Sequence, residues 1–276
     1  MAALCLLALL AAVPADAGLR YRFAFENGPT GSVWADGTRC RVEFAPAEEP
    51  AKPATAAEAV EAGMALYDLI LDDGEQRFYV DSAGKTYWNA SEHGVLPVRE
   101  RPSLPFVMIA GEERSVLEPS VQVTEEDYAE PVAGLPTRKF VIRIRYWLEH
   151  EFPNEVVHTT VSGIWLLWTT AALEGRPCGI DPGALSTDID GIDALLQPEL
   201  AKIPGFPVMR QLSVTHRIYR GTSTTGIETL TLDGFEPVHP PASLFAVPEG
   251  YRHQAPVFAG LEVVERVLPA AEEPSP

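Results

Sequence analysis

The chain has 276 residues, of which 46% are hydrophobic and 22% are charged, and this composition excludes a disordered or fibrous protein. Its 21 basic and 39 acidic residues give a formal net charge of −18 at pH 7. Such a charge repels nucleic acid and anionic membrane surfaces, so we expect neither as a partner.

The first residues predict export. Residues 3–13 form an uninterrupted hydrophobic stretch that is too short to cross a bilayer, and residues 15–17 read Ala-Asp-Ala, although a basic start is missing. This pattern predicts a signal peptide at residues 1–17 and a periplasmic or secreted product with no integral membrane segment. We expect residues 18–268 to form a single β domain and residues 269–276 to be a disordered acidic tail.

The cysteines allow one disulfide in the exported protein. Cys5 lies within the expected signal peptide, so Cys40 and Cys178 remain as a pair in an oxidising compartment. They form a bridge or stay as two separate buried thiols, because a sequence does not show whether two residues are close in space.

The first half of the domain is typical of a meander of short strands joined by tight turns such as Asp36-Gly37. The expected strands are Leu19–Asn27, Ser32–Ala35, Thr38–Phe44, Met64–Leu71, Gln76–Asp81 and Thr86–Ala90. Thr55-Ala56-Ala57-Glu58 has capping-box spacing, which predicts a short helix within the Ala- and Pro-rich residues 45–63. Residues 91–116 contain three prolines and predict an irregular crossing.

Longer elements follow in the second half. The expected ones are strands at Glu113–Thr124, Arg138–Leu148, Val156–Ala172, 208–219 and Thr222–Leu232, with a turn at Pro131–Pro136. Apolar residues at helical spacing predict a helix over Ile189–Ile203, with Ser186, Asp188 and Asp190 available as caps. The total of about ten strands and two helices indicates a mainly β (α+β) fold with a large antiparallel sheet.

Two adjacent strands are unusually well patterned. In Arg138–Leu148, the positions from Phe140 to Leu148 that carry apolar residues alternate with Arg143, Arg145 and Trp147. In the next strand, both faces are apolar over Ile164–Trp168. Since an antiparallel sheet normally turns one face to water, the second face needs a helix, an oligomer contact or an apolar ligand there.

No motif of a known catalytic site is present: the chain lacks the Gly-x-Ser-x-Gly elbow, His-Glu-x-x-His, Cys-x-x-Cys and nucleotide-binding glycine loops. The string from Ser186 to Gly191 imitates part of a calcium loop, but Gln197 stands where the closing Glu belongs, so a helix cap explains it better. His150 and His158 lie among glutamates at a hairpin corner, where solvated charge is a simpler explanation than a metal enzyme. We therefore expect no enzyme, no cofactor and no metal.

The tryptophans are open to two interpretations. They could line a ligand cavity, but their usual role in a β domain is core packing, which we favour. The five are Trp34, Trp88, Trp147, Trp165 and Trp168.

Several short motifs follow one another in a recognisable order along most of the mature chain. They are Tyr21–Phe25, Gly31–Trp34, Gly37–Glu43, Asp72–Gly74, Lys85–Trp88, Ala133–Phe140, the strand around Trp165, Gly205–Val208 and Ser243–Tyr251. In this order they resemble the periplasmic lipoprotein-carrier (LolA-like) superfamily. The resemblance implies a strongly bent antiparallel sheet, or incomplete β-barrel, with one or two helices across its concave face. It also implies an apolar cavity, which in characterised members holds lipid chains, and it brings no catalytic residue. The inserts at 45–63 and 174–190 depart from the pattern.

These observations favour a carrier- or chaperone-like protein that binds a lipid, lipoprotein acyl chains or another apolar ligand in the concave face. We expect the helix at 189–203 and the crossing at 97–110 to act as its lid. The alternative is a cell-envelope structural or protein-interaction module that uses the same apolar face for an envelope protein or a second copy. The expected lining consists of bulky apolar residues: Trp165, Leu167, Trp147, Phe106 and Met108.

Overall fold

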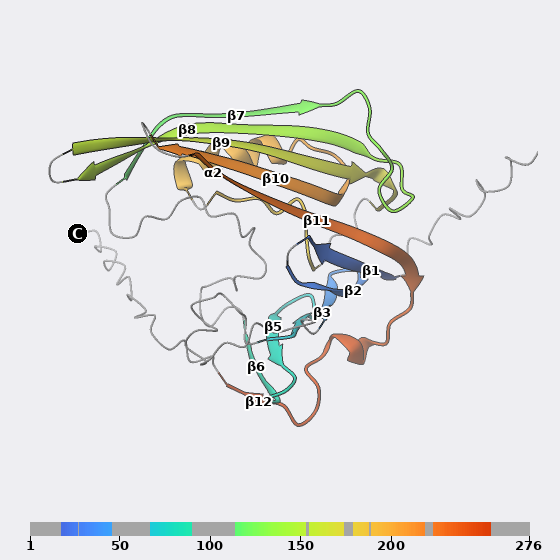
Figure 1. The fold of residues 1–276 in the computed structure, drawn as a ribbon. Helices are drawn as coiled ribbons and strands as arrows, with labels where there is room; N and C mark the ends of the chain where they lie inside the picture. The colour runs from blue at the N-terminus through green and yellow to red at the C-terminus, as the bar shows by residue number, and fades with distance from the viewer. Residues whose placement is uncertain are drawn as a thin grey trace, which may run out of the picture.

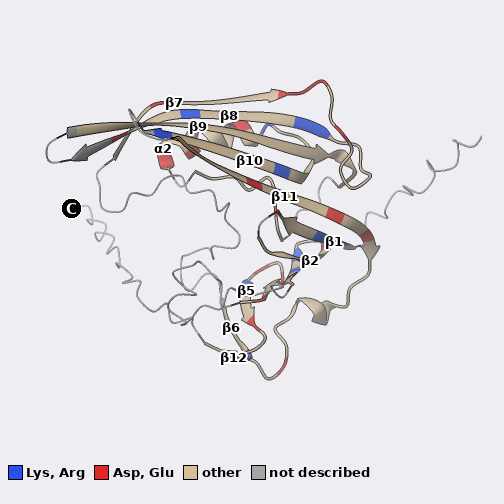
Figure 2. Cartoon of the chain, viewed as in Figure 1, with Lys and Arg blue, Asp and Glu red and all other residues tan. Residues whose placement is uncertain are grey.

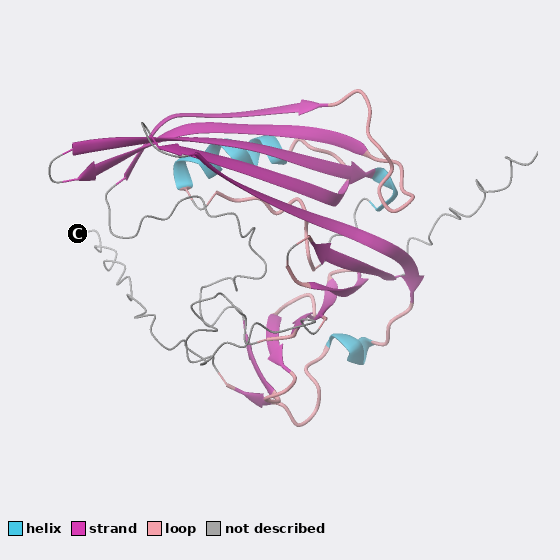
Figure 3. Ribbon diagram, in the orientation of Figure 1, coloured by secondary structure: helices cyan, strands magenta, loops and turns pink. Residues whose placement is uncertain are grey.

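The computed structural model describes residues 18–26, 28–45, 67–89, 114–152, 155–173, 179–187, 189–218 and 223–254. Within these ranges the chain is mostly β, with twelve strands in one large, open and bent sheet and one α-helix packed on it (Figures 1 and 3). The expectation of a mainly β fold built on one large sheet is confirmed. No helix in the described ranges is both long enough and apolar enough to cross a membrane.

The strands follow the chain largely as hairpins. They are β1 (Gly18–Phe25), β2 (Thr30–Asp36), β3 (Arg39–Phe44), β4 (Leu69–Asp72), β5 (Arg77–Asp81), β6 (Thr86–Asn89), β7 (Arg114–Glu125), β8 (Arg138–Phe152), β9 (Glu155–Thr170), β10 (Phe206–Ile218), β11 (Ser223–Val238) and β12 (Arg252–His253). The helix is α2 (Asp190–Leu200), and short 3-10 turns are η3 (Ala171–Leu173) and η4 (Ala242–Phe245). The expected signal peptide, the helix near residue 55, the crossing at 97–110 and the tail lie outside the described residues.

The sheet is open and slightly mixed. Its strand order is β12-β6-β5-β4-β3-β2-β1-β11-β10-β9-β8-β7, so β12 and β7 form its edges. The expected antiparallel pairing holds except at one edge, where β12 runs parallel to β6. This difference arises because the chain after β11 passes through η4 before it reaches β6, whereas a tight hairpin would have reversed its direction.

The sheet bends where β1 meets β11. In Figure 1, the long strands β7–β11 form one layer, and β1–β6 turn away from it on the side where α2 lies. We call this side the inner face and the opposite side the outer face. The pairing of β1 with β11 is interrupted between Arg20 and Arg22, and Gly234 on β11 has a positive φ of 64°. Such irregularities increase local twist, which lets one sheet change direction.

The tight turns follow their sequence signals. Gly37, between β2 and β3, has a φ of 62°. The turn expected at Pro131–Pro136 is confirmed: Ala133 and Gly134 both have positive φ, and the backbones of Val132 and Leu135 exchange hydrogen bonds of 3.2 and 2.9 Å around them.

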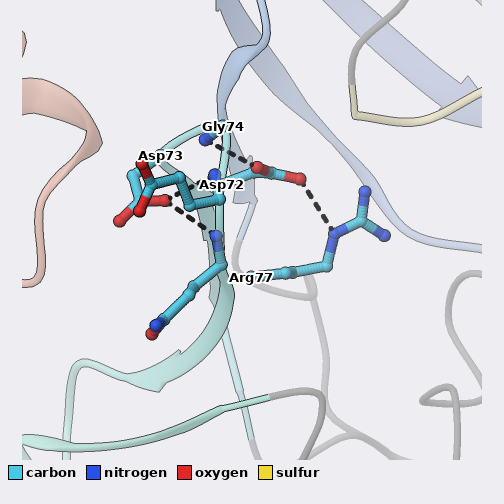
Figure 4. A network of polar contacts seen from close by, with 6 residues as sticks. Asp72, Asp73, Gly74 and Arg77 are labelled. Carbon is cyan, nitrogen blue, oxygen red and sulfur yellow. Dashed lines mark hydrogen bonds and ion pairs between the residues drawn. The ribbon is translucent and has the colours of Figure 1, made fainter.

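The hairpin between β4 and β5 is held by acidic side chains (Figure 4). Asp72 Oδ1 accepts the N–H of Gly74 at 3.0 Å, and its other oxygen lies 3.3 Å from Arg77 Nε. The aspartate therefore both closes the turn and ties it to the next strand.

Helix α2 begins close to its expected start, but neither Ser186 nor Asp190 caps it. The N-cap position is Ile189, which has no side-chain capping bond. Asp193 in the first turn instead accepts hydrogen bonds from the Ser186 hydroxyl at 2.6 Å and from the Thr187 amide and hydroxyl at 2.7 Å each. The preceding segment is thereby folded back onto the helix. Asp188 lies outside the described residues.

The segment 242–251 covers the outer face of β4–β6. Leu69, Leu71 and Val80 are buried there and pack with Val247. Strand β4 is therefore buried on both faces, in agreement with its hydrophobic sequence Leu69-Ile70-Leu71.

Candidate functional site: the inner face of the sheet

The inner face is apolar across almost the whole sheet. Directly paired residues of antiparallel strands lie on the same face, so the register defines rows of side chains. One row runs from β6 to β1: Trp88, Tyr79, Ile70, Val42, Val33 and Tyr21. A second runs from β1 to β8: Phe25, Leu230, Arg210, Leu167 and Phe140. All members are buried, and Arg210 alone in these two rows is charged.

Aromatic rings touch one another along the first half of this face. Ring centroids are 5.5 Å apart for Phe23 and Phe44, 5.7 Å for Phe44 and Tyr67, 5.0 Å for Tyr67 and Tyr79, and 5.5 Å for Tyr79 and Trp88. These separations are favourable for aromatic pairs. We call these five residues the aromatic cluster.

Helix α2 occupies the inner face of the second half. Ile192 and Leu196 of the helix are fully buried and share a hydrophobic cluster with Trp165 and Tyr146 of the sheet. Burial raises the pKa of the Tyr146 hydroxyl, and the negative charge of Asp193 raises it further. The side chains of the protein itself therefore fill this part of the face.

Residues 179–187, which we call the inner segment, lead into α2 along the same face. A Cβ atom at Gly179 would meet side-chain atoms of Val33 and Val42 at 2.9 Å each, so this end lies directly against β2 and β3. Asp193 holds the other end to the helix. The inner segment and α2 thus form one continuous cover over the middle of the inner face.

A buried ion pair lies beneath this cover. Arg210 is 1% exposed and Glu228 is 9% exposed, and Arg210 Nη2 lies 2.9 Å from Glu228 Oε1. Arg210 Nη1 contacts the Ala184 carbonyl of the inner segment at 3.5 Å, and the guanidinium lies 5.7 Å from the ring centre of Phe25. Burial lowers the pKa of Arg210, while the charges of Glu228 and Asp181 raise it.

The outer face of the long strands differs from the inner face. Figure 2 shows that these strands are mostly uncharged, with isolated basic and acidic positions. Arg143 and Arg145 are exposed, as their place in the alternation predicts. Ile164 and Ile227 are 49% and 58% exposed and lie in one row on either side of Ser213. This face therefore offers isolated apolar and cationic groups to solvent.

The structure brings together two of the expected lining residues. Trp165 and Leu167 lie on the inner face in the cluster that contains α2, and they are 1% and 2% exposed. Trp147 is half-buried on the outer face, because it has the opposite place in the strand alternation. Phe106 and Met108 lie outside the described residues.

Cys40 is part of a disulfide. Its partner lies outside the described residues, as does Cys178, so the pairing of these two stays a prediction. Gly179, the next residue after Cys178, lies against Val42, which shares the inner face of β3 with Cys40.

The corner that contains His150 and His158 is described only in part. His158 Nε2 lies 3.7 Å from Glu149 Oε2 on the neighbouring strand, while the backbone of His150 pairs with Val157. In the part of the chain that the structure describes, no three His, Cys, Asp or Glu residues gather in a way that could hold a metal ion.

An open cleft of about 520 Å³ lies on the outer side, next to η4. Two of its charged groups have partners: Arg39 pairs with Asp36 and lies 5.0 Å from the ring centre of Phe245, and Asp73 accepts backbone amides of its own turn. The cleft is lined by Arg39, Asp73, Glu75, Phe78, Tyr87, Ala242, Phe245, Ala246 and Val247.

Arg210 and Glu228 were not predicted from the sequence as site residues. The signal was present: Arg210 stands between Val208 and Leu212 in the alternation of β10, and Glu228 is two residues before Leu230 in β11. Each is a charged residue at an inward-facing position of a strand whose neighbouring inward-facing residues are apolar. A search for this pattern would have identified both residues.

Comparison of the chain with protein-family models, curated proteins and solved structures finds no match.

Proposed function

We propose that this protein is an exported, non-enzymatic carrier that holds a lipid or another apolar molecule against the inner face of its sheet. The apolar rows that cross this face from Trp88 to Phe140 carry the proposal. The expected signal peptide at residues 1–17 and the motif resemblance to periplasmic lipoprotein carriers support it. The resemblance also supports a periplasmic or secreted location.

The aromatic cluster is the part of the inner face best suited to the ligand. The side chains of α2 pack against β7–β10, and none of the five aromatic residues belongs to that packing cluster. Each methylene group of an acyl chain buried there would stabilise the complex by roughly 0.8 kcal/mol, and this energy would offset the packing that is lost when the cover moves. The inner segment and α2 would then act as the lid.

A photoreactive ligand tests which face is used. The full-length mature protein is incubated with a fatty alcohol that carries a diazirine, irradiated, digested and mapped by mass spectrometry. We expect labels on inner-face residues such as Phe23, Tyr79 and Trp88. Labels confined to outer-face residues such as Ile164 and Ile227, or no saturable labelling, would contradict the proposal.

A second candidate function is a cell-envelope interaction module. The exposed Ile164 and Ile227 on the outer face favour it, since exposed apolar residues on a sheet face are common at contact surfaces. Light scattering during size-exclusion chromatography tests the case of a second copy: a dimer that dissociates in the Ile164→Ser variant supports it, and a monomer at all accessible concentrations opposes it.

A further inference from the structure

The buried pair of Arg210 and Glu228 is out of place on an apolar face. Arg210 is flanked in its row by Leu230 and Leu167, and Glu228 pairs in register with Leu212. A buried ion pair contributes little net stability, because desolvation of both charges offsets their attraction. The position of this pair is therefore better explained by a function in binding than by a contribution to the stability of the core.

The donors of Arg210 are only partly used. Of its nitrogens, Nη2 has a good bond to Glu228 at 2.9 Å, and Nη1 reaches the Ala184 carbonyl only at 3.5 Å. Nε is buried and has no hydrogen-bond partner among the residues that the structure describes. A guanidinium carries five N–H groups, and buried donors are normally paired. Arg210 thus has capacity for a further acceptor.

The inner segment supplies the groups that an incoming anion would replace. The Ala184 carbonyl accepts a hydrogen bond from Arg210. Asp181 adds a negative charge that is close enough to raise the pKa of the guanidinium. Asp181 lies at the surface of the inner segment, yet burial raises the pKa of its carboxyl group, so the carboxylate regains hydration when the segment moves. The exchange of this carboxylate for a ligand anion would leave the local charge unchanged.

We propose that the ligand is an amphiphile with an anionic oxygen headgroup, which Arg210 binds while the acyl chain lies on the aromatic cluster. This inference rests on the proposed function and adds the headgroup to it. Glu228 keeps its hydrogen bond from Nη2 of Arg210. The headgroup accepts hydrogen bonds from Nε and from Nη1, and at Nη1 it replaces the Ala184 carbonyl. Planar carboxylates and phosphates both match the donor geometry of a guanidinium.

The test compares a fluorescent fatty acid, cis-parinaric acid, with its uncharged methyl ester on the full-length mature protein. We expect the acid to bind about tenfold to a hundredfold more tightly, the range set by a hydrogen bond to a charged group. In the double variant Arg210→Met/Glu228→Leu, which removes both charges together, the two probes should bind equally. Arg143→Met, an exposed arginine on the outer face, is the control that keeps the preference.

The outcomes separate the two proposals. Binding of both probes with equal affinity to the wild type, or a preference that survives in the double variant, overturns the headgroup site while apolar binding stands. Binding of neither probe overturns the carrier function and the headgroup site together. Near-ultraviolet circular dichroism verifies that the double variant is folded. Displacement of the bound acid by dodecanoate and by dodecyl phosphate, with dodecanol as control, then tells which anion is preferred.

Discussion

The two faces of the long strands share a backbone but differ in what packs on them. On β8, Ile142, Ile144 and Tyr146 are at most 2% exposed, whereas Arg143 and Arg145 at the alternate positions are exposed. Strand propensity acts on both sets alike, so the difference comes from α2 and the inner segment on one side and water on the other. The inner face therefore carries most of the packing energy of this region.

The two faces also differ in how much a charged side chain affects stability. A charge on the outer face lies in water, where an ion pair is worth about 0–1 kcal/mol. Arg210 and Glu228 on the inner face are buried, so the loss of either partner leaves an uncompensated charge. One substitution on the inner face should accordingly matter more than several on the outer face.

The largest contrast is expected between neighbours on β9. Trp165→Ala should reduce the free energy of unfolding by about 4 kcal/mol, because it removes a fully buried side chain beside α2. Ile164→Ala, on the outer face, should change it by less than about 1 kcal/mol. Urea unfolding measures both, and similar losses would break the distinction between the faces.

Substitutions of the buried ion pair test how strongly the inner face depends on paired charges. Glu228→Leu should destabilise the protein by about 3 kcal/mol because it leaves Arg210 buried without its partner, whereas Arg210→Met/Glu228→Leu should be close to neutral. A double variant no more stable than the single one would mean that the two charges are not coupled. The same urea experiment reads out both variants.

Helix α2 offers a similar pair of neighbours. Leu196→Ala should lower the free energy of unfolding by about 2.5 kcal/mol because Leu196 is fully buried against the sheet. Leu195→Ala, at a residue that is 43% exposed, should cost less than about 1 kcal/mol. Equal effects would show that the helix does not cover the inner face in solution.

The smallest effect is expected at the exposed turn of Asp73. Its Oδ1 accepts the N–H groups of Gln76 at 2.8 Å and Glu75 at 2.9 Å, and these bonds lower the pKa of the carboxyl group. The stability that they add is present above the unfolded pKa of about 3.9 and is lost as pH falls through the lower folded value. The urea midpoints of wild type and Asp73→Asn should therefore differ slightly at neutral pH and converge in acid, and a pH-independent difference would contradict this.

Alternation of apolar residues was enough to predict which side chains of β8 lie on each face, because a strand has a period of two. Alternation also placed Trp147 with Arg143 and Arg145, opposite the apolar face of β8, yet Trp147 was selected as lining because it is bulky and apolar. Residue type was thus a poorer guide to the candidate site than strand position.

Other features depend on contacts that a sequence does not display. The two-residue strand β12 exists only because the chain after η4 is laid along β6, where the Arg252 amide donates to the Lys85 carbonyl at 3.0 Å. Asp193 replaced the expected caps because the preceding loop folds back onto the helix. Both are consequences of tertiary packing, which local patterns do not encode.

Native mass spectrometry of the protein, isolated from its own host under gentle conditions, tests the carrier account most directly. The account predicts a bound apolar species of defined mass, one per chain, that organic solvent releases. Repeated preparations that show the polypeptide mass alone would contradict it.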